Sequence, residues 1–246
     1  MQRLEGKVAI ITGSSGGIGE GIARVFDAEG ASLVINSRTG VDEGRAVAAS
    51  LSDAHYVQGD VSSDDQARRL VDEALERWGR LDILVNNAGF TIEMDHDDLD
   101  ALTDEVWEQL LANNLKAPWY VTRAAVPALR ATGDGAVINV GSMSGVRSTY
   151  WERTSLAYGV AEAALNHLTT LLATVLGPEI RVNGVLPGII FSRASTGALY
   201  PMVEQTAPLG RIGQPRDIGD ACLLMACGRY ITGENLVVDG GLLLRK

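Results

Sequence analysis

The sequence predicts an α/β fold in which a doubly wound parallel sheet of about seven strands is covered by helices on both faces. One reason is length, because 246 residues suit one domain that can bury a sizeable core. A second is that short β-rich runs alternate with helical patterns from end to end, which is typical of βαβ units. A third is that no repeat or linker interrupts this alternation, so residues 1–246 are expected to form a single domain.

The expected strands are short runs rich in Val, Ile and Leu. They lie at residues 8–11, 32–35, 55–58, 83–85, 136–140, 181–185 and 235–238. Between them, apolar residues recur with the period of a helix, most clearly over residues 19–29, 64–78, 103–131 and 157–176. Pro and Gly punctuate residues 187–214 too densely for the sheet. Because long loops in compact domains are often lids, a substrate loop is expected at residues 190–214.

Composition limits the partners and the compartment. A net charge of −10 argues against nucleic acid, since phosphate backbones are bound by basic surfaces. No apolar run approaches the ~18 residues of a membrane span, and the chain enters a strand at Val8 without a visible signal peptide. Cys222 and Cys227 lie in an apolar stretch and are expected to stay reduced. These features predict a cytoplasmic protein with no membrane partner.

The densest acidic run, residues 93–100, could be imagined as a metal site. It lacks the spacing of metal ligands and the apolar support that such a site needs. A solvated loop leading into a helix is the better interpretation, and no metal site is expected.

Residues 12–19, Thr-Gly-Ser-Ser-Gly-Gly-Ile-Gly, connect the first expected strand to a helix. In that context Gly13 permits a tight turn, Gly17 lets the backbone approach a pyrophosphate, and Gly19 allows the helix to pack closely on the strand. The helix N-terminus adds amide donors and partial positive charge. A structural turn would also use glycines, but the flanking strand and helix favour a dinucleotide site that includes Ser15 and Ile18.

The end of the second strand reads Asn36-Ser37-Arg38. Proteins that select NAD usually carry Asp or Glu there to bind the ribose 2′-hydroxyl. Ser37 and Arg38 instead offer a hydroxyl and a fork of donors suited to phosphate. NADP(H) is therefore favoured over NAD(H), and the alternative is that Arg38 merely points to solvent.

These motifs, together with Asn86-Asn87-Ala88-Gly89 and the tyrosine-centred segment 158–162, resemble the short-chain dehydrogenase/reductase family over essentially the whole chain. The resemblance implies a Rossmann-like oxidoreductase acting on a small molecule. Its members are usually homotetramers or dimers built through the helices around 103–131 and 157–176. It also extends the cofactor site to Asp60, Val61, Asn87, Ala88, Gly89, Pro187, Gly188, Ile190 and Ser192. Asn87 is further expected to bridge two strands.

The same resemblance assigns the catalytic residues. In the family a Ser and a Tyr polarise the substrate carbonyl, the Tyr is the acid or base, and a Lys and an Asn relay protons. Ser142, Tyr158 and Asn114 match the Ser, the Tyr and the Asn, with Ser144 as a second candidate for the Ser. The segment between Ser142 and Tyr158 is three residues longer than usual, so residues 150–153 are expected to bulge toward the substrate. Ser144, Trp151 and Phe191 are expected at the substrate mouth.

Glu162 occupies the position where the family keeps Lys, one helical turn after Tyr158. An unperturbed Tyr has a pKa of about 10, and a full charge about 6 Å away at an effective dielectric of about 20 changes it by roughly two units. Replacing a cation by an anion is therefore expected to raise the Tyr158 pKa by up to about four units, less if Glu162 takes a proton or turns away. Lys7, Lys116 and Lys246 are poorly placed to compensate, which leaves Arg153 as the local cation.

Because alcohol oxidation needs phenolate and carbonyl reduction needs phenol, the substitution should harm oxidation more. Three interpretations stay open. The protein is a reductase that tolerates or uses Glu162, a variant changed at one position, or a nucleotide-binding protein with little or no turnover.

Overall fold

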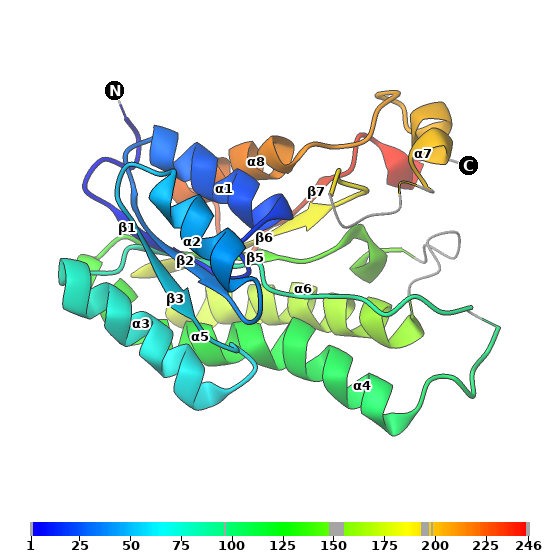
Figure 1. Cartoon of the computed structure of the whole chain (residues 1–246), viewed down its shortest axis with the longest axis horizontal. Helices are drawn as coiled ribbons and strands as arrows, with labels where there is room; N and C mark the ends of the chain where they lie inside the picture. The colour runs from blue at the N-terminus through cyan, green and yellow to red at the C-terminus, as the bar shows by residue number, and fades with distance from the viewer. Residues whose placement is uncertain (1, 96, 148–154, 193–196, 198, 245–246) are drawn as a thin grey trace.

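The sheet of this protein contains seven parallel strands in the order β3-β2-β1-β4-β5-β6-β7 (Figure 1). The structure, a computed structural model, describes all residues except 1, 96, 148–154, 193–196, 198 and 245–246. The strands are β1 (Val8–Ile11), β2 (Ser32–Ser37), β3 (Ala54–Gln58), β4 (Ile83–Asn86), β5 (Gly135–Val140), β6 (Ile180–Pro187) and β7 (Asn235–Val238). The seven strands that the sequence predicts are all confirmed, with ends that differ by one or two residues at most.

Helices cover both faces of the sheet. They are α1 (Gly17–Ala28), α2 (Val41–Ala49), α3 (Asp64–Trp78), α4 (Asp104–Leu111), α5 (Ala117–Thr132), α6 (Leu156–Leu176), α7 (Tyr200–Thr206) and α8 (Pro215–Cys227). Figure 1 shows α1, α2 and α8 on one face and α3, α5 and α6 on the other. The doubly wound arrangement is therefore confirmed.

Two apolar cores result from the alternation of side chains along each strand. On β1, Ala9 and Ile11 pack with α1, α2 and α8, whereas Val8 and Ile10 pack with α3, α5 and α6. Both sets are almost fully buried. This explains why the central strands are apolar throughout rather than alternating with polar residues.

Two segments differ from the sequence-based expectation. Residues 103–131 form α4 and α5 joined by a π-helical turn, η1 (Ala112–Lys116), instead of one regular helix. The stretch 187–214 contains the short helix α7, although Pro and Gly suggested a wholly irregular loop. Val203 and Ala207 of this stretch pack on Met143 and Leu242, so its described part is anchored to the domain.

Among the described helices, α6 has the length and composition to cross a membrane, with 21 residues and a mean hydropathy of 1.2 over its most apolar window. This qualifies the prediction that no apolar run approaches that length. Core helices of layered domains share this composition, and α6 packs against β5 and β6.

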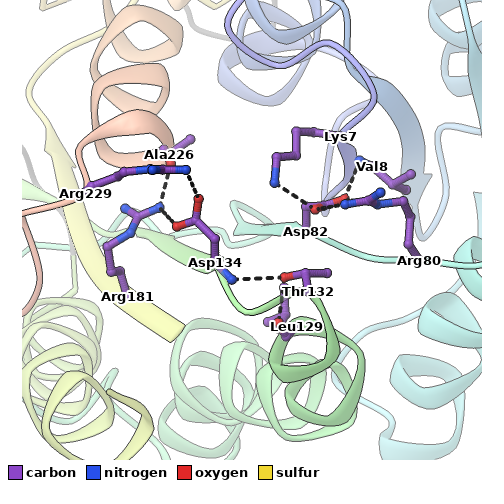
Figure 2. Close-up of polar contacts among 10 residues, drawn as sticks. All are labelled: Lys7, Val8, Arg80, Asp82, Leu129, Thr132, Asp134, Arg181, Ala226 and Arg229. Atoms are coloured by element: carbon purple, nitrogen blue, oxygen red, sulfur yellow. Dashed lines mark hydrogen bonds and ion pairs between the residues drawn. The ribbon is translucent and has the colours of Figure 1, made fainter. Parts of the chain in front are cut away.

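At the amino-terminal edge of the sheet, carboxylates are held by cations (Figure 2). Asp82, directly before β4, accepts hydrogen bonds from Lys7 Nζ at 3.1 Å, from the Val8 N–H at 3.0 Å and from Arg80 at 2.7 and 2.8 Å. Asp134, directly before β5, forms ion pairs with Arg181 and Arg229. Lys7 therefore lies at the edge opposite the strand ends that carry the predicted site, as the sequence suggested.

Candidate active site

The loop between β1 and α1 leads into a helix whose first amides have no side-chain cap among the described residues. Gly13 and Gly17 adopt φ angles of +63° and +56°, which L side chains rarely adopt. A Cβ on Gly13 would lie 2.8 Å from the Ala88 Cα, whereas a Cβ on Gly16 or Gly17 would meet nothing within 4 Å. Uncapped amides facing open space suit an anion such as a pyrophosphate.

Asn87 connects the ends of β1 and β4, as predicted. Its side-chain nitrogen donates to the carbonyl oxygens of Thr12 and Gly13 at 2.9 and 3.1 Å. In return the Thr12 hydroxyl accepts from the N–H groups of Asn87 and Ala88 at 2.9 and 3.0 Å. Thr12 is a buried positioning residue that was not expected from the sequence, although a hydroxyl at a strand end is a signal for it.

A cleft of about 460 Å³ lies where the sheet order reverses between β1 and β4, the usual ligand position in such sheets. Most residues predicted to bind the cofactor line it. They are Gly13, Ser15, Gly17, Ile18, Gly19, Ser37, Arg38, Asp60, Val61, Asn87, Ala88, Gly89, Ile190 and Ser192.

Pro187 and Gly188 do not line this cleft. Pro187 ends β6 and is buried, and a Cβ on Gly188 would lie 2.7 Å from the Asp239 Cβ. These two residues aim the following segment into the cleft instead of forming its wall. Phe90 and Asn113 do line it, and no sequence motif indicated them.

A larger hollow of about 1290 Å³ shares the glycine loop and Phe191 with this cleft but extends over α1, α2 and α8. Part of its wall consists of surface ion pairs, such as Arg24 with Glu20. The strand ends that carry the predicted cofactor residues lie at the smaller cleft.

Arg38 and Ser37 differ in what they present to the cleft. The Arg38 side chain is 54% exposed, with one guanidinium nitrogen 3.8 Å from Asp60 Oδ2. Partial burial opposes ionisation of Asp60, yet hydrogen bonds from Ser62 and the charge of Arg38 hold its pKa below the ordinary value. The Ser37 hydroxyl is turned inward, within 2.9 Å of both the Gly40 carbonyl oxygen and the Tyr56 hydroxyl. Arg38 is thus the better placed of the two to meet a phosphate.

Ser142 follows β5 and caps the short 3₁₀ turn η2 (Met143–Gly145). Its hydroxyl accepts from the Ser144 N–H at 3.1 Å and donates to the Ser144 hydroxyl at 3.1 Å. The two candidates for the carbonyl-polarising serine are therefore hydrogen-bonded to each other.

Tyr158 lies in the first turn of α6, which begins after Ser155. The buried Ser155 hydroxyl accepts from the Tyr158 N–H at 3.2 Å, and the Ser155 N–H donates to the Ile92 carbonyl oxygen at 3.1 Å. The cap fixes the backbone that carries Tyr158. Ser155 was missed in the sequence, where a serine before an apolar helix is the signal.

Glycines allow η2 to lie directly on the start of α6. A Cβ on Gly145 would lie 2.7 Å from the backbone of Glu162 and Ala163, and one on Gly159 would lie 3.5 Å from the Ser144 carbonyl oxygen. This packing brings Ser144 of η2 beside the helical turns that carry Tyr158 and Glu162.

Asn114 is buried in the π-helical turn η1. Its oxygen accepts from the Phe90 N–H at 3.0 Å, and its nitrogen donates to the carbonyl oxygens of Phe90 and Leu110 at 2.9 and 3.1 Å. The side chain is thus engaged with the backbone. These bonds tie Asn114 to the loop after β4, and the proton relay that the resemblance implied stays a prediction.

Glu162 is 4% exposed and lies behind Tyr158 on α6. Burial raises the pKa of its carboxyl to about 8, against the opposing effect of a hydrogen bond from the Tyr158 hydroxyl. The carboxyl is therefore mostly neutral at pH 7. The expected rise of the Tyr158 pKa assumed a fully ionised Glu162, so it applies only at a pH above about 8.

No lysine lies beside Glu162 in the part of the chain that the structure describes. Lys7 is at the opposite edge of the sheet, and Lys116 is exposed on η1. Lys246, Arg153 and Trp151 lie outside the described residues, as does the bulge expected at 150–153.

The expected substrate mouth is described in part. Phe191 is 42% exposed, and its ring centroid lies 6.1 Å from that of Tyr200 at the start of α7. The Tyr200 hydroxyl accepts from the Ser192 N–H at 3.2 Å. The expected substrate loop therefore places an aromatic pair next to the cleft of about 460 Å³.

Known proteins resemble this chain over nearly its full length. The family model described as enoyl-(acyl carrier protein) reductase matches residues 13–243. "Granaticin polyketide synthase putative ketoacyl reductase 2" of Streptomyces violaceoruber is 45% identical over 242 residues, 96% of each chain.

Two solved structures have the same fold. One, titled a "putative short-chain dehydrogenase/reductase" from Burkholderia xenovorans, is 34% identical with a TM-score of 0.90, over 97% of this chain and 98% of the other. A blue fluorescent protein from a metagenomic library, in complex with NADPH, is 32% identical with a TM-score of 0.89, over 98% and 99%. The chain belongs to the short-chain dehydrogenase/reductase family of oxidoreductases.

Proposed function

We propose that this protein is an NADPH-dependent carbonyl reductase. The observation that supports this best is the packing of η2 on the first turns of α6, where a Cβ on Gly159, the residue after Tyr158, would lie 3.5 Å from the Ser144 carbonyl oxygen. The cleft of about 460 Å³ lies at the same edge of the sheet. The activity is reduction of a ketone, an aldehyde or a related C=N group in a small, mostly apolar substrate.

Arg38 supports NADP(H) rather than NAD(H), because a guanidinium suits a 2′-phosphate and no carboxylate ends β2. The glycine loop and the open start of α1 would hold the pyrophosphate, and Asn87 to Gly89 the ribose side. The NADPH complex of a structural relative agrees with this choice.

When bound, the reduced nicotinamide supplies a hydride to the carbonyl carbon. Ser142 donates a hydrogen bond to the carbonyl oxygen and polarises it. Tyr158 transfers its phenolic proton to that oxygen, and a positioned acid of this kind typically contributes about 10²–10⁴-fold. The neutral state of Glu162 helps here, because a nearby anion would hold the phenolic proton more tightly.

The exposed Phe191 beside Tyr200 favours apolar or aromatic substrates. Together with Ser144 and Trp151, this pair would form the substrate mouth. The granaticin relative is named as a ketoacyl reductase, so polyketide-like ketones belong in the first panel of substrates.

The protein is further proposed to be cytoplasmic and to form a homodimer or homotetramer through α5 and α6. Large apolar side chains are exposed on these helices, namely Trp119, Leu156, Val160, Leu171 and Val175. Gel filtration with light scattering tests the oligomer, and a monomer would contradict it.

A second candidate function is nucleotide binding with little or no turnover. The observation that favours it is the carboxyl at position 162, with no cation beside it in the described part of the chain.

Oxidation of NADPH in the presence of ketones, ketoacyl thioesters and imines separates the two functions. The proposal predicts turnover that falls by at least about 10²-fold in Tyr158→Phe with unchanged NADPH affinity. Cofactor binding without turnover across the whole panel would instead support the second function.

A further inference from the structure

Glu162 and Tyr158 form a pair in which one acid lies behind the other. Tyr158 is half-buried near the start of α6, and Glu162, one turn further along, is 4% exposed. Residues four apart on a helix share a face, and the Tyr158 hydroxyl hydrogen-bonds to the Glu162 carboxyl. A proton can therefore pass between the two side chains without a movement of the backbone.

Glu162 lies among buried acceptor oxygens that lack a hydrogen-bond donor. Glu162 Oε2 and Asn166 Oδ1 are both buried and lack a hydrogen-bond partner among the described residues. Both flank Gly141, where a Cβ would lie 3.2 and 3.1 Å from them. Ionised, the carboxyl would leave two adjacent buried acceptors unpaired, which is costly. A proton on Glu162 turns one of these acceptors into a donor.

Within the described residues, which leave out 148–154, no other titratable group faces this carboxyl from the elements that pack on α6. The turn η2 and strand β5 contain none, and Arg181 of β6 bonds to carbonyl oxygens of Met225 and Ala226 at the far end of that strand. The remaining charged groups are exposed to solvent, and they are Asp104, Glu105 and Glu108 of α4, Lys116 of η1 and His167 of α6.

We propose that Glu162 is the proton source that returns Tyr158 to its acid form after each reduction. The O–H bond of Tyr158 breaks as the substrate oxygen takes its proton, while the carbon takes the hydride of the reduced nicotinamide. The Glu162 carboxyl then turns its O–H toward Tyr158, that O–H bond breaks, and its proton forms the new O–H bond of Tyr158. The Glu162 carboxylate regains a proton from water. This inference rests on the proposed carbonyl reduction.

The test is the pH profile of kcat for reduction in wild type, Glu162→Gln and Glu162→Asp, with Glu76→Gln on the exposed face of α3 as the matched control. Wild type should lose activity above a pH near 8, as Glu162 ionises. Glu162→Gln should lower kcat about 10- to 100-fold and abolish the alkaline limb of the pH profile, which is the loss of activity above a pH near 8. The amide has nearly the size of the carboxyl but cannot donate an acidic proton. Glu162→Asp should restore the limb in part, and Glu76→Gln should match wild type.

A second readout needs neither cofactor nor substrate. Infrared spectra of the cofactor-free protein should show a protonated carboxyl band at pH 7 that disappears above a pH near 8 and is missing in Glu162→Gln. A purely structural Glu162 would lower stability or kcat in the variant without moving the pH limb.

The outcomes separate the two proposals. Turnover in wild type with the same pH profile in Glu162→Gln overturns the role of Glu162 and leaves the reductase intact. Turnover in Glu162→Lys but none in wild type overturns it too, and shows that the site works only with a cation. Absence of turnover in both overturns the proposed function, and the proton source with it.

Discussion

Two buried carboxyls at opposite edges of the sheet have opposite charge states. Asp82 is fully buried before β4, and Glu162 is 4% exposed on α6. Burial is the largest influence on both and favours the neutral acid. At Asp82, hydrogen bonds from Arg80, the Val8 N–H and Lys7 together outweigh it and hold the pKa below the ordinary value (Figure 2). At Glu162 the hydrogen bond from Tyr158 lowers the pKa by less than burial raises it. The partners, not the depth of burial, decide the charge.

This difference separates a carboxylate that stabilises the fold from a carboxyl that can exchange a proton near neutral pH. An ionised and paired Asp82 closes the end of the sheet, where its charge is constant over the physiological range. Glu162, which has no cation beside it in the described part of the chain, changes charge close to neutral pH, beside the residue proposed to donate the proton. Perturbed carboxyls of this kind are typical of functional sites.

The largest expected effect is on the pH dependence of stability. The folded pKa of Glu162 is about 8 against an ordinary value of 4.5, so the native state binds more protons than the unfolded state between these limits. The free energy of unfolding should therefore fall as the pH rises from 4.5 to 8, by up to about 5 kcal/mol, and level off above. Urea unfolding should show this fall in wild type and not in Glu162→Gln. An equal fall in the free energy of unfolding in wild type and Glu162→Gln would mean that Glu162 does not differ from an ordinary carboxyl.

Asp82 should behave in the opposite way. Its folded pKa is lowered, so its contribution is present above the unfolded value near 3.8 and is lost as the pH falls through the folded pKa. Asp82→Asn should cost about 2–3 kcal/mol at pH 7, because hydrogen bonds between charged groups are removed. The cost should shrink at acid pH. If Asp82→Asn left the free energy of unfolding at pH 7 unchanged, the cations would not be stabilising this carboxylate.

Asp60 is the intermediate case, a half-exposed carboxylate beside the Arg38 guanidinium. Here the cation is proposed to serve the cofactor. Arg38→Ala should raise the KM for NADPH about tenfold, equivalent to about 1.4 kcal/mol, and leave that for NADH nearly unchanged. Steady-state kinetics with both cofactors measures this, and an equal change for both would remove the argument for NADP(H).

The smallest effect is expected at Ser155. Ser155→Ala removes the cap of α6 and should cost about 1 kcal/mol of stability, while Ser155→Thr should keep most of it. Thermal unfolding of the two variants gives the values. Equal destabilisation by Thr and Ala would mean that the hydroxyl is not what holds the start of α6.

Much of this fold could be predicted from periodicity. The apolar strands and the glycine loop carry strong local signals, and the strand ends bring most of the predicted cofactor residues to one cleft. The π-helical turn at Ala112–Lys116 has no such signal, since the sequence around Asn114 fits a regular helix equally well. The helix α7 was obscured by the Pro and Gly residues around it.

The site was harder to predict where its properties depend on packing. The resemblance to the family implied that Glu162 stands where a lysine is usual, but the sequence left open whether its carboxyl is ionised. Its proton follows from burial against Gly141 and Asn166, which no spacing of residues reveals. Likewise, the inward turn of the Ser37 hydroxyl depends on Tyr56 of the neighbouring strand.

The most direct test of this account is a ¹³C NMR titration of the glutamate carboxyls in the cofactor-free protein, with the Glu162 signal assigned from its loss in Glu162→Gln. The account predicts a midpoint near pH 8. A midpoint near the ordinary value of 4.5 would mean that Glu162 is ionised at neutral pH and would contradict it.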